Sequence, residues 1–163
     1  MILPEDLQKI KDENSFPNYF EFLYELVEGL KPKVVVEIGT HAGISASFLK
    51  GGYPGMELYT IDIDPESGWL IRDSSIIQIK RDSKYALEDV PKEIDLLFID
   101  GDHTLEGCQS DYDLYAPLVK KGGIILVDDI LGSEGVRAFW KNLGKGEVIN
   151  GMHGIYGMGI IYK

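Results

Sequence analysis

The feature that most constrains the fold of this chain is a short apolar run that ends in a glycine-containing turn. Residues 34–38 are Val-Val-Val-Glu-Ile, and Gly39 and Gly43 follow, four residues apart. A continuous apolar run of this length is typical of a parallel strand buried on both faces, and glycine lets the backbone turn sharply. The residues from Ile44 onward then indicate a helix. Strand, turn and helix in this order favour an α/β fold, and an ordinary turn without a ligand is the competing interpretation.

The alternation of strand and helix continues along the chain. Further strands are predicted at 57–63, 76–80, 94–100 and 124–127, with an antiparallel pair within 147–163. Helices are predicted at 4–11, 18–29, 83–87, 105–119 and 133–143, the last capped by Ser133. Such alternation is typical of a mostly parallel sheet with helices on both faces. At 163 residues, the expectation is one domain over 1–163 with an N-terminal helical segment over 1–30.

Charge and composition narrow the classes of partner. Acidic residues outnumber basic ones by 27 to 16, and no run of Lys or Arg is present to bind a nucleic acid. No apolar stretch is long enough to span a bilayer, and residues 1–11 lack the order of charges and apolar residues that marks a signal peptide. We therefore expect a small-molecule partner, no membrane partner and a cytoplasmic location. Cys108 is the single cysteine, which excludes an intramolecular disulfide.

Acidic and polar residues occupy the predicted carboxyl ends of the strands, where parallel sheets bind ligands. Asp62 lies about 20 residues beyond the glycine turn, where a carboxylate can accept hydrogen bonds from both hydroxyls of a ribose. Asp82 and Ser83 follow the third strand and could hydrogen-bond an adenine edge. The competing interpretation is that these residues only end a strand or form turns.

Three more acids and a histidine follow the fourth and fifth strands. If these strands are neighbours, Asp100, Asp128 and Asp129 gather in a small volume. Like charges at short distance raise one another's pKa unless a cation neutralises them, and Mg²⁺ prefers carboxylate oxygens. His103, three residues after Asp100, could act as a general base near neutral pH. Solvated turn acids and a structural histidine are the alternatives.

These motifs, in this order, resemble those of class I S-adenosylmethionine-dependent methyltransferases. The matching stretches are residues 35–49, 59–65, 81–83, 96–103 and 122–130, and residues 157–162 resemble the final strand of that fold. The likeness is strongest to the metal-dependent O-methyltransferases, of the catechol and caffeoyl-CoA types, and to a small bacterial and archaeal group with a Phe-Ile-Asp-Gly-Asp-His segment. The resemblance implies a three-layer, Rossmann-like, seven-stranded sheet whose last strand is antiparallel.

The resemblance also implies S-adenosyl-L-methionine and a divalent metal, Mg²⁺ above all, as cofactors. Gly39 and Gly43 would pass close to the methionine part, Ser45 would bind its carboxylate and Glu37 would support the site. The full set of implied cofactor-binding residues is Glu37, Gly39, His41, Gly43, Ser45, Asp62, Asp82, Ser83 and Asp100. Asp100, Asp128 and Asp129 match the metal ligands. His103 stands where several members carry a catalytic lysine, so it is the predicted base.

The predicted function is therefore metal-assisted O-methylation of a small hydroxylated compound. Histidine in place of lysine and Arg81 in place of a small residue depart from the pattern, and the chain is short of residues that could form a lid. One alternative is a non-catalytic S-adenosylmethionine-binding module. Another is an NAD(P)-dependent oxidoreductase, against which the missing third glycine of G-x-G-x-x-G argues. The acceptor, and whether copies associate as a homo-oligomer, are left open.

Overall fold

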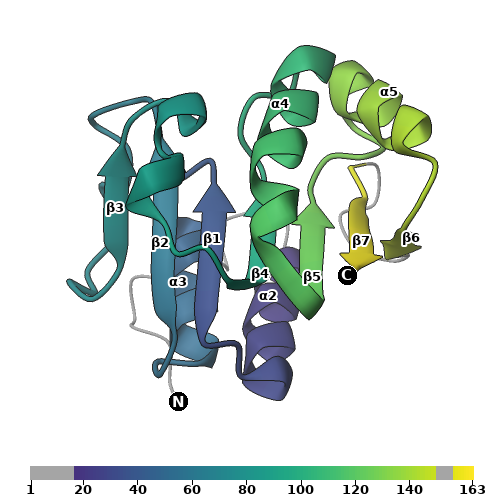
Figure 1. Cartoon of the computed structure of the whole chain (residues 1–163). Coiled ribbons are helices and arrows are strands. Elements are labelled where there is room, and N and C mark those ends of the chain that lie inside the picture. Colours follow the sequence, from purple (N-terminus) through teal and green to yellow (C-terminus); the bar gives the residue numbers. More distant parts are fainter. Residues whose placement is uncertain (1–16, 150–155) are drawn as a thin grey trace.

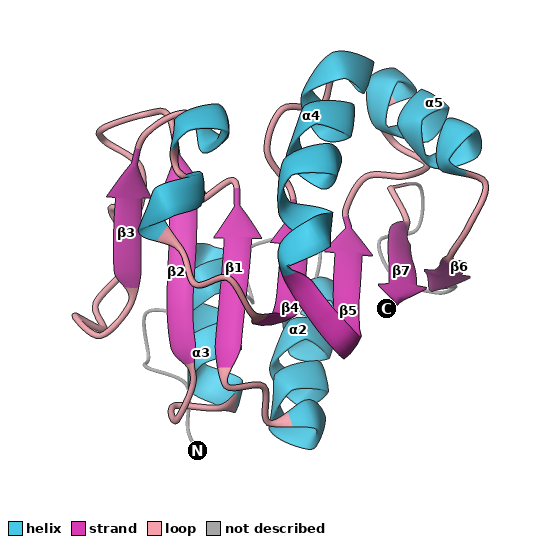
Figure 2. Ribbon diagram, in the orientation of Figure 1, coloured by secondary structure: helices cyan, strands magenta, loops and turns pink. Residues whose placement is uncertain are grey.

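Seven strands form one sheet in the order β3-β2-β1-β4-β5-β7-β6. The computed structural model describes residues 17–149 and 156–163. Figures 1 and 2 show the strands side by side in the sheet. The strands are β1 (Val34–Ile38), β2 (Glu57–Asp62), β3 (Ile77–Lys80), β4 (Ile94–Ile99), β5 (Val119–Val127), β6 (Glu147–Ile149) and β7 (Met158–Tyr162). This is the Rossmann-like arrangement that the sequence predicts.

The first five strands are parallel, so their carboxyl ends meet at one edge of the sheet. β1 lies between β2 and β4, and its Val36 is in register with Tyr59 of β2 and Leu97 of β4. β7 runs antiparallel to both β5 and β6. The predicted antiparallel pair at the end of the chain is therefore confirmed.

Helices cover both faces of the sheet, and each face has its own apolar core (Figure 1). α2 (Pro17–Leu30) and α3 (Ile44–Gly52) lie on one face, where Leu23 and Val27 of α2 pack in one core with Phe98. α4 (Leu105–Tyr115) and α5 (Glu134–Leu143) lie on the other. α5 ends at Gly144, whose left-handed φ of 61° suits glycine. No helix among the described residues is long and apolar enough to cross a membrane.

The helix predicted over 105–119 is wrong at its end. α4 stops at Tyr115, a 3-10 turn η3 (Ala116–Leu118) follows, and β5 already begins at Val119, which pairs with Ile94. Pro117 explains the break, because proline lacks the amide proton that an α-helix interior requires. The fifth strand therefore starts five residues earlier than the predicted Ile124.

Two further predictions differ in detail. The predicted helix at 83–87 is a pair of 3-10 turns, η1 (Ser83–Tyr85) and η2 (Leu87–Asp89), which are too short to form an α-helix. Ser133 precedes α5 as predicted but makes no side-chain cap, because its hydroxyl donates to the carbonyl of His103 (3.0 Å). The predicted helix at 4–11 lies outside the described residues.

Candidate functional site

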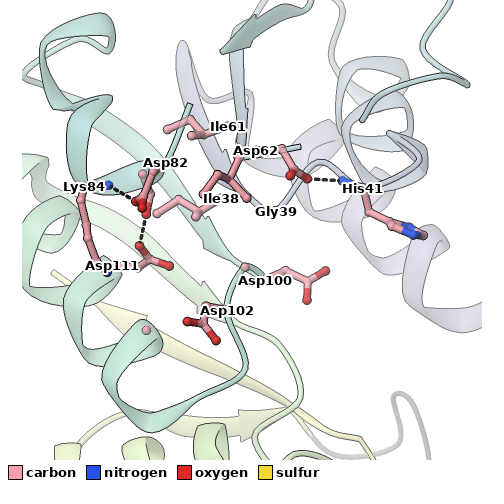
Figure 3. Close-up of a pocket in the computed structure, with 14 residues that line it drawn as sticks. Ile38, Gly39, His41, Ile61, Asp62, Asp82, Lys84, Asp100, Asp102 and Asp111 are labelled. Atoms are coloured by element: carbon pink, nitrogen blue, oxygen red, sulfur yellow. Dashed lines mark hydrogen bonds between the residues drawn. The ribbon is translucent and has the colours of Figure 1, made fainter. Parts of the chain in front are cut away.

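Two cavities adjoin at the carboxyl ends of the parallel strands. The first, of about 430 Å³, is lined from the ends of β1, β2 and β4, from η1 and from α4 (Figure 3). The second, of about 390 Å³, is lined from α2, the glycine turn and the ends of β4 and β5. Both cavities share the walls formed by Gly39, His41, Asp100 and Gly101. Two adjoining cavities therefore lie at the edge of the sheet where the sequence predicts the site.

The two glycines of the turn are required by the packing of the chain itself. Gly39 has a φ of 101°, and a Cβ at this position would lie 1.9 Å from the carbonyl oxygen of Asp100. Gly43 has a φ of 85°, and a Cβ there would lie 2.4 Å from Cγ1 of Ile71. Glycine thus lets the turn fit between the end of β4 and the loop after β2. Gly39 lines both cavities, whereas Gly43 lines neither.

Asp62 is held at the wall of the first cavity by two backbone donors. The amide of His41 donates to Oδ2 (2.7 Å) and the amide of Asp64 donates to Oδ1 (2.9 Å). Each oxygen keeps acceptor capacity for a ligand. His41 contributes its backbone here, since its imidazole points away from Asp62 (Figure 3) and meets the ring of Trp69 edge-on at 5.2 Å.

Glu37 lies under the turn in a closed hydrogen-bond network. Ser45 Oγ donates to Oε1 and Thr60 Oγ1 donates to Oε2, each at 2.5 Å. The side chain is fully buried, and this burial raises the pKa of Glu37 to about 8, although the two hydroxyls oppose the rise. Glu37 therefore supports Ser45, which lines the second cavity, and does not line either cavity itself.

The ends of β4 and β5 bring Asp100, Asp128 and Asp129 together around His103. Nε2 of His103 lies 3.3 Å from Asp100, and Nδ1 lies 3.2 Å from Asp129. The hydrogen bond and charge of Asp100, with the charge of Asp129, raise the pKa of His103, although partial burial opposes this. The imidazole therefore bridges two of the three carboxylates, those of Asp100 and Asp129.

Asp128 has one carboxylate oxygen without a hydrogen-bond partner among the described residues. Its Oδ1 is buried without a hydrogen bond from the described part of the chain. Burial, followed by the charges of Asp100 and Asp129, raises the pKa of Asp128 to about 8. As the described residues stand, no three His, Cys, Asp or Glu side chains are arranged to hold a metal ion. The unpartnered oxygen nevertheless fits a hard cation, because carboxylate oxygens are the ligands that Mg²⁺ prefers.

Asp82 and Ser83 lie at the far end of the first cavity. Asp82 accepts a hydrogen bond from the amide of Lys84 (2.9 Å). Ser83 Oγ donates to Oδ1 of Asp111 on α4 (2.5 Å), and the hydroxyl of Tyr115 donates to the Ser83 carbonyl (2.7 Å). These two hydrogen bonds hold η1 against α4, and both elements line this end of the first cavity.

The structure adds two residues that sequence reasoning missed. Asp111 lines the first cavity and is buried, and the signal that could have found it is an acid on the same helix face as Cys108 and Tyr115. Tyr19 of α2 lines the second cavity together with Asp100. No local sequence motif identifies Tyr19 as a site residue, because α2 is brought next to the strand ends only by the tertiary fold.

Comparison with known proteins adds independent evidence. A family model described as a methyltransferase domain matches residues 36–130, which is more than half of the chain. An uncharacterised protein of Acanthamoeba polyphaga mimivirus, R132, is 32% identical. That alignment covers 72% of this chain but 63% of R132, so the chain spans less than two thirds of this relative.

Solved structures share the fold at low sequence identity. The O-methyltransferase TomG of Streptomyces achromogenes, in complex with S-adenosylmethionine, superposes with a TM-score of 0.71 at 19% identity, over 96% of this chain and 88% of TomG. MycE, a methyltransferase of the mycinamycin biosynthetic pathway in complex with Mg, S-adenosylhomocysteine and mycinamycin VI, gives 0.68 at 16% identity, over 97% of this chain and 52% of MycE. At these identities the likeness shows a common fold.

Proposed function

Because this chain belongs to the methyltransferase domain family, we propose that it transfers a methyl group from S-adenosylmethionine to a hydroxyl oxygen of a small molecule. The observation that carries the proposal is the pair of adjoining cavities, with Asp62 in the wall of the first and with Asp100, Asp128 and His103 in the wall of the second. The first cavity suits the adenosine part of the methyl donor. The shared wall at Gly39 suits the methionine part, and the second cavity suits the acceptor.

Asp62 is proposed to bind the ribose. Its two oxygens are fixed by backbone donors and keep acceptor capacity, which two vicinal hydroxyls can use. Asp82 and Ser83 would flank the adenine, and Gly39, Gly43 and Ser45 would contact the methionine end. TomG, whose fold this chain shares, binds S-adenosylmethionine, which supports this assignment.

His103 is proposed to take the proton from the acceptor hydroxyl. The oxygen then forms a bond to the methyl carbon as the carbon–sulfur bond breaks, and S-adenosylhomocysteine leaves with the electron pair on sulfur. Such a displacement needs the oxygen close to and in line with the methyl carbon, so positioning supplies much of the rate. In the structure both ring nitrogens face carboxylates, those of Asp100 and Asp129, so the imidazole accepts the proton only after one of these two contacts opens.

Asp100, Asp128 and Asp129 are proposed to hold a divalent ion, with Mg²⁺ as the first candidate. When bound, such an ion lowers the pKa of an acceptor hydroxyl and helps to orient it. The unpartnered Oδ1 of Asp128 supports this proposal, as does the Mg in the complex of MycE. Ion binding would have to compete with His103, which spans two of the three acids.

Titration calorimetry with S-adenosylmethionine and S-adenosylhomocysteine tests the donor assignment. We expect both to bind, and we expect Asp62→Asn to weaken binding by about 10-fold or more, because a charged acceptor of hydrogen bonds is lost. Asp64→Asn is the matched control, since Asp64 is exposed and lies outside both cavities. Failure of the unaltered protein to bind either compound would end the proposal.

Methyl transfer to a catechol-type acceptor, assayed with Mg²⁺ and with a chelator, tests the reaction. Chelation is expected to reduce turnover, and Asp128→Asn is expected to abolish the response to Mg²⁺ while leaving S-adenosylhomocysteine binding intact. Donor binding without turnover of any hydroxylated acceptor would instead indicate a binding module. If chelation and Asp128→Asn both leave turnover unchanged, the metal is not part of the reaction.

A further inference from the structure

A chain of hydrogen bonds joins two hydroxyls of the second cavity through the core. Ser45 Oγ donates to Oε1 of Glu37, and Thr60 Oγ1 donates to Oε2, each at 2.5 Å. Thr60 Oγ1 also lies 2.6 Å from Thr40 Oγ1. Thr40 and Ser45 line the second cavity, whereas Glu37 and Thr60 are fully buried. The order of the groups is therefore Thr40, Thr60, Glu37 and Ser45, with a residue of the cavity wall at each end.

The number of protons in this chain of hydrogen bonds sets what its two ends offer to a ligand. Each hydroxyl has one proton to donate, and an ionised carboxylate can only accept. With Glu37 ionised, Ser45 and Thr60 donate their protons to its two oxygens. The proton of Thr40 then goes to Thr60, because Thr60 has already donated its own. In this state Thr40 and Ser45 can accept hydrogen bonds from a ligand but cannot donate one.

One added proton on Glu37 turns one hydroxyl proton toward the cavity. If the added proton is on Oε1, Glu37 donates to Ser45, whose own proton is then free for a ligand. If it is on Oε2, Glu37 donates to Thr60, Thr60 donates to Thr40, and the proton of Thr40 becomes free. In both cases the cavity gains a hydroxyl donor and the buried negative charge disappears. A ligand carboxylate benefits from both changes, because it only accepts hydrogen bonds and is itself negative.

The charged groups that face Glu37 oppose its ionisation. Burial raises the pKa of Glu37 to about 8, and the charges of Asp100 after β4 and Asp62 at the end of β2 act in the same direction. The two neighbouring hydroxyls act against this rise. Tyr19 of α2 is the other ionisable group nearby, and burial, with the charges of four acids that include Glu37, raises the pKa of its phenol. Near neutral pH, Glu37 therefore carries the added proton.

We propose that Glu37 is a positioning residue that keeps its proton when the carboxylate of the methyl donor binds, so that the affinity for the donor falls as Glu37 ionises. The inference rests on the proposed binding of S-adenosylmethionine and deepens it. Ser45 or Thr40 gives the hydroxyl donor, and the proton on Glu37 frees that hydroxyl without contact between Glu37 and the ligand. The methionine end of the donor is thus recognised by the protein in which Glu37 is neutral.

Calorimetry across a range of pH tests this coupling without relying on turnover. The probe is the deaminated analogue of S-adenosylhomocysteine, which keeps the carboxylate and has no amine to titrate. Its affinity for the unaltered protein is expected to fall about 10-fold between pH 7 and pH 9, the loss that ionisation of a group with a pKa of about 8 gives over this range. 5′-Methylthioadenosine lacks the whole amino-acid end, so its affinity is expected to change by less than about 2-fold.

Two variants identify the group that titrates. Glu37→Gln has an oxygen and an amide donor where the protonated carboxyl had an oxygen and a hydroxyl, so it is expected to bind the analogue equally at pH 7 and pH 9. Asp128→Asn tests the other candidate, because Asp128 lines the same cavity and its pKa is also raised to about 8. The fall in affinity is expected to persist in Asp128→Asn.

The outcomes separate the two proposals. If the unaltered protein binds neither S-adenosylhomocysteine nor the analogue, the proposed function fails and the inference fails with it. If the analogue binds equally at pH 7 and pH 9, if Glu37→Gln keeps the fall in affinity, or if Asp128→Asn loses it, the donor site stands and the role of Glu37 is wrong.

Should Glu37→Gln not fold, the heat of binding at pH 9, measured in two buffers of different ionisation enthalpy, still decides. Uptake of about one proton per bound analogue, by the unaltered protein and by Asp128→Asn, supports the proposal. Binding without proton uptake by either of these two proteins overturns it.

Discussion

At the scale of single residues, Glu37 is an acid kept in the core by two hydroxyl donors. Its pKa is raised from about 4.5 to about 8 because burial outweighs the hydrogen bonds from Ser45 and Thr60. A group with a raised folded-state pKa stabilises the fold below its unfolded-state pKa and loses that contribution as the pH rises through the folded-state pKa. The relevant window therefore runs from about pH 4.5 to about pH 8.

The first prediction concerns this window. Glu37→Gln is expected to gain stability relative to the unaltered protein as the pH rises from about 5 to about 9, by roughly a few kcal/mol, because glutamine has no proton to lose. Thermal or urea unfolding across the pH range measures the difference. Glu88→Gln is the control, since Glu88 is 87% exposed and pairs with Lys92 on the surface. A pH-independent difference for Glu37→Gln would show that Glu37 titrates normally.

The second prediction concerns His103. His103→Gln is expected to lower kcat by about 10²- to 10⁴-fold, the usual loss when a general base is removed. The affinity for S-adenosylhomocysteine is expected to stay within a few-fold, because Asp62 and the first cavity are untouched. Steady-state kinetics with saturating donor, together with calorimetry, separate these effects. A kcat close to that of the unaltered protein would rule out His103 as the base.

The sequence predicts the acids of the site better than their surroundings. Asp100, Asp128 and Asp129 could be placed together because each ends a parallel strand, and neighbouring strands end side by side. The position of the His103 imidazole between Asp100 and Asp129 depends on side-chain conformations, which residue spacing in the sequence does not predict. Helical spacing could have placed Asp111 on the buried face of its helix, but its contact with Ser83 could not be predicted, because η1 follows a different strand and meets α4 only in the folded chain.

At the scale of elements, the turn after β1 packs against the end of β4, and Gly39 is the residue that allows this close approach. The third prediction is that Gly39→Ala destabilises the protein by about 3 kcal/mol or more, because a Cβ would overlap the Asp100 carbonyl at 1.9 Å and alanine disfavours a φ of 101°. Thermal unfolding should show a Tm lower by roughly 10 °C.

Gly29→Ala is the matched control for that prediction. Gly29 lies in α2, and a Cβ there would meet nothing within 4 Å. Alanine is expected to stabilise this helix by up to about 1 kcal/mol, because it has the higher helix propensity. Similar unfolding temperatures for the two alanine variants would contradict the steric explanation of Gly39.

The periodicity of apolar residues predicted most helices and strands. It placed the end of α4 wrongly, because one residue, Pro117, ends the helix before the apolar spacing stops. Val119 continues the apolar spacing of α4, yet it pairs with Ile94 in the sheet because Pro117 has already broken the helix. The short segment after Asp82 has no periodicity to separate an α-helix from 3-10 turns. Local pattern therefore fixed the type of each long element, and tertiary pairing fixed where it began and ended.

At the scale of the whole molecule, negative charge dominates, with a net charge of −11 and five aspartates around the first cavity. The fourth prediction is that S-adenosylmethionine, which carries a net positive charge, loses affinity by a few-fold as salt rises from about 0.05 M to about 0.5 M. Neutral S-adenosylhomocysteine is expected to change less. Calorimetry at matched pH gives both dissociation constants, and identical salt dependence would show that the field of the protein does not act on the donor.

The matched family region and the cavity walls nearly coincide. The first cavity is lined by residues between 38 and 111, all within the 36–130 match. The second cavity also draws Tyr19 and Phe20 from α2, outside that match. The matched region therefore carries the proposed donor site, and α2 contributes to the wall of the proposed acceptor cavity from outside that match.

Because β7 lies between β5 and β6, a strand that comes late in the chain is inserted between two that precede it. Residues that line the cavities all lie between Tyr19 and Asp128, so the ribosome synthesises the cavity walls before β6 and β7. Until β7 arrives, the edge of β5 is uncovered and open to pairing with other chains. During synthesis, the ligand-binding half of the molecule is thus complete first, and the edge beside it is the last part to be protected.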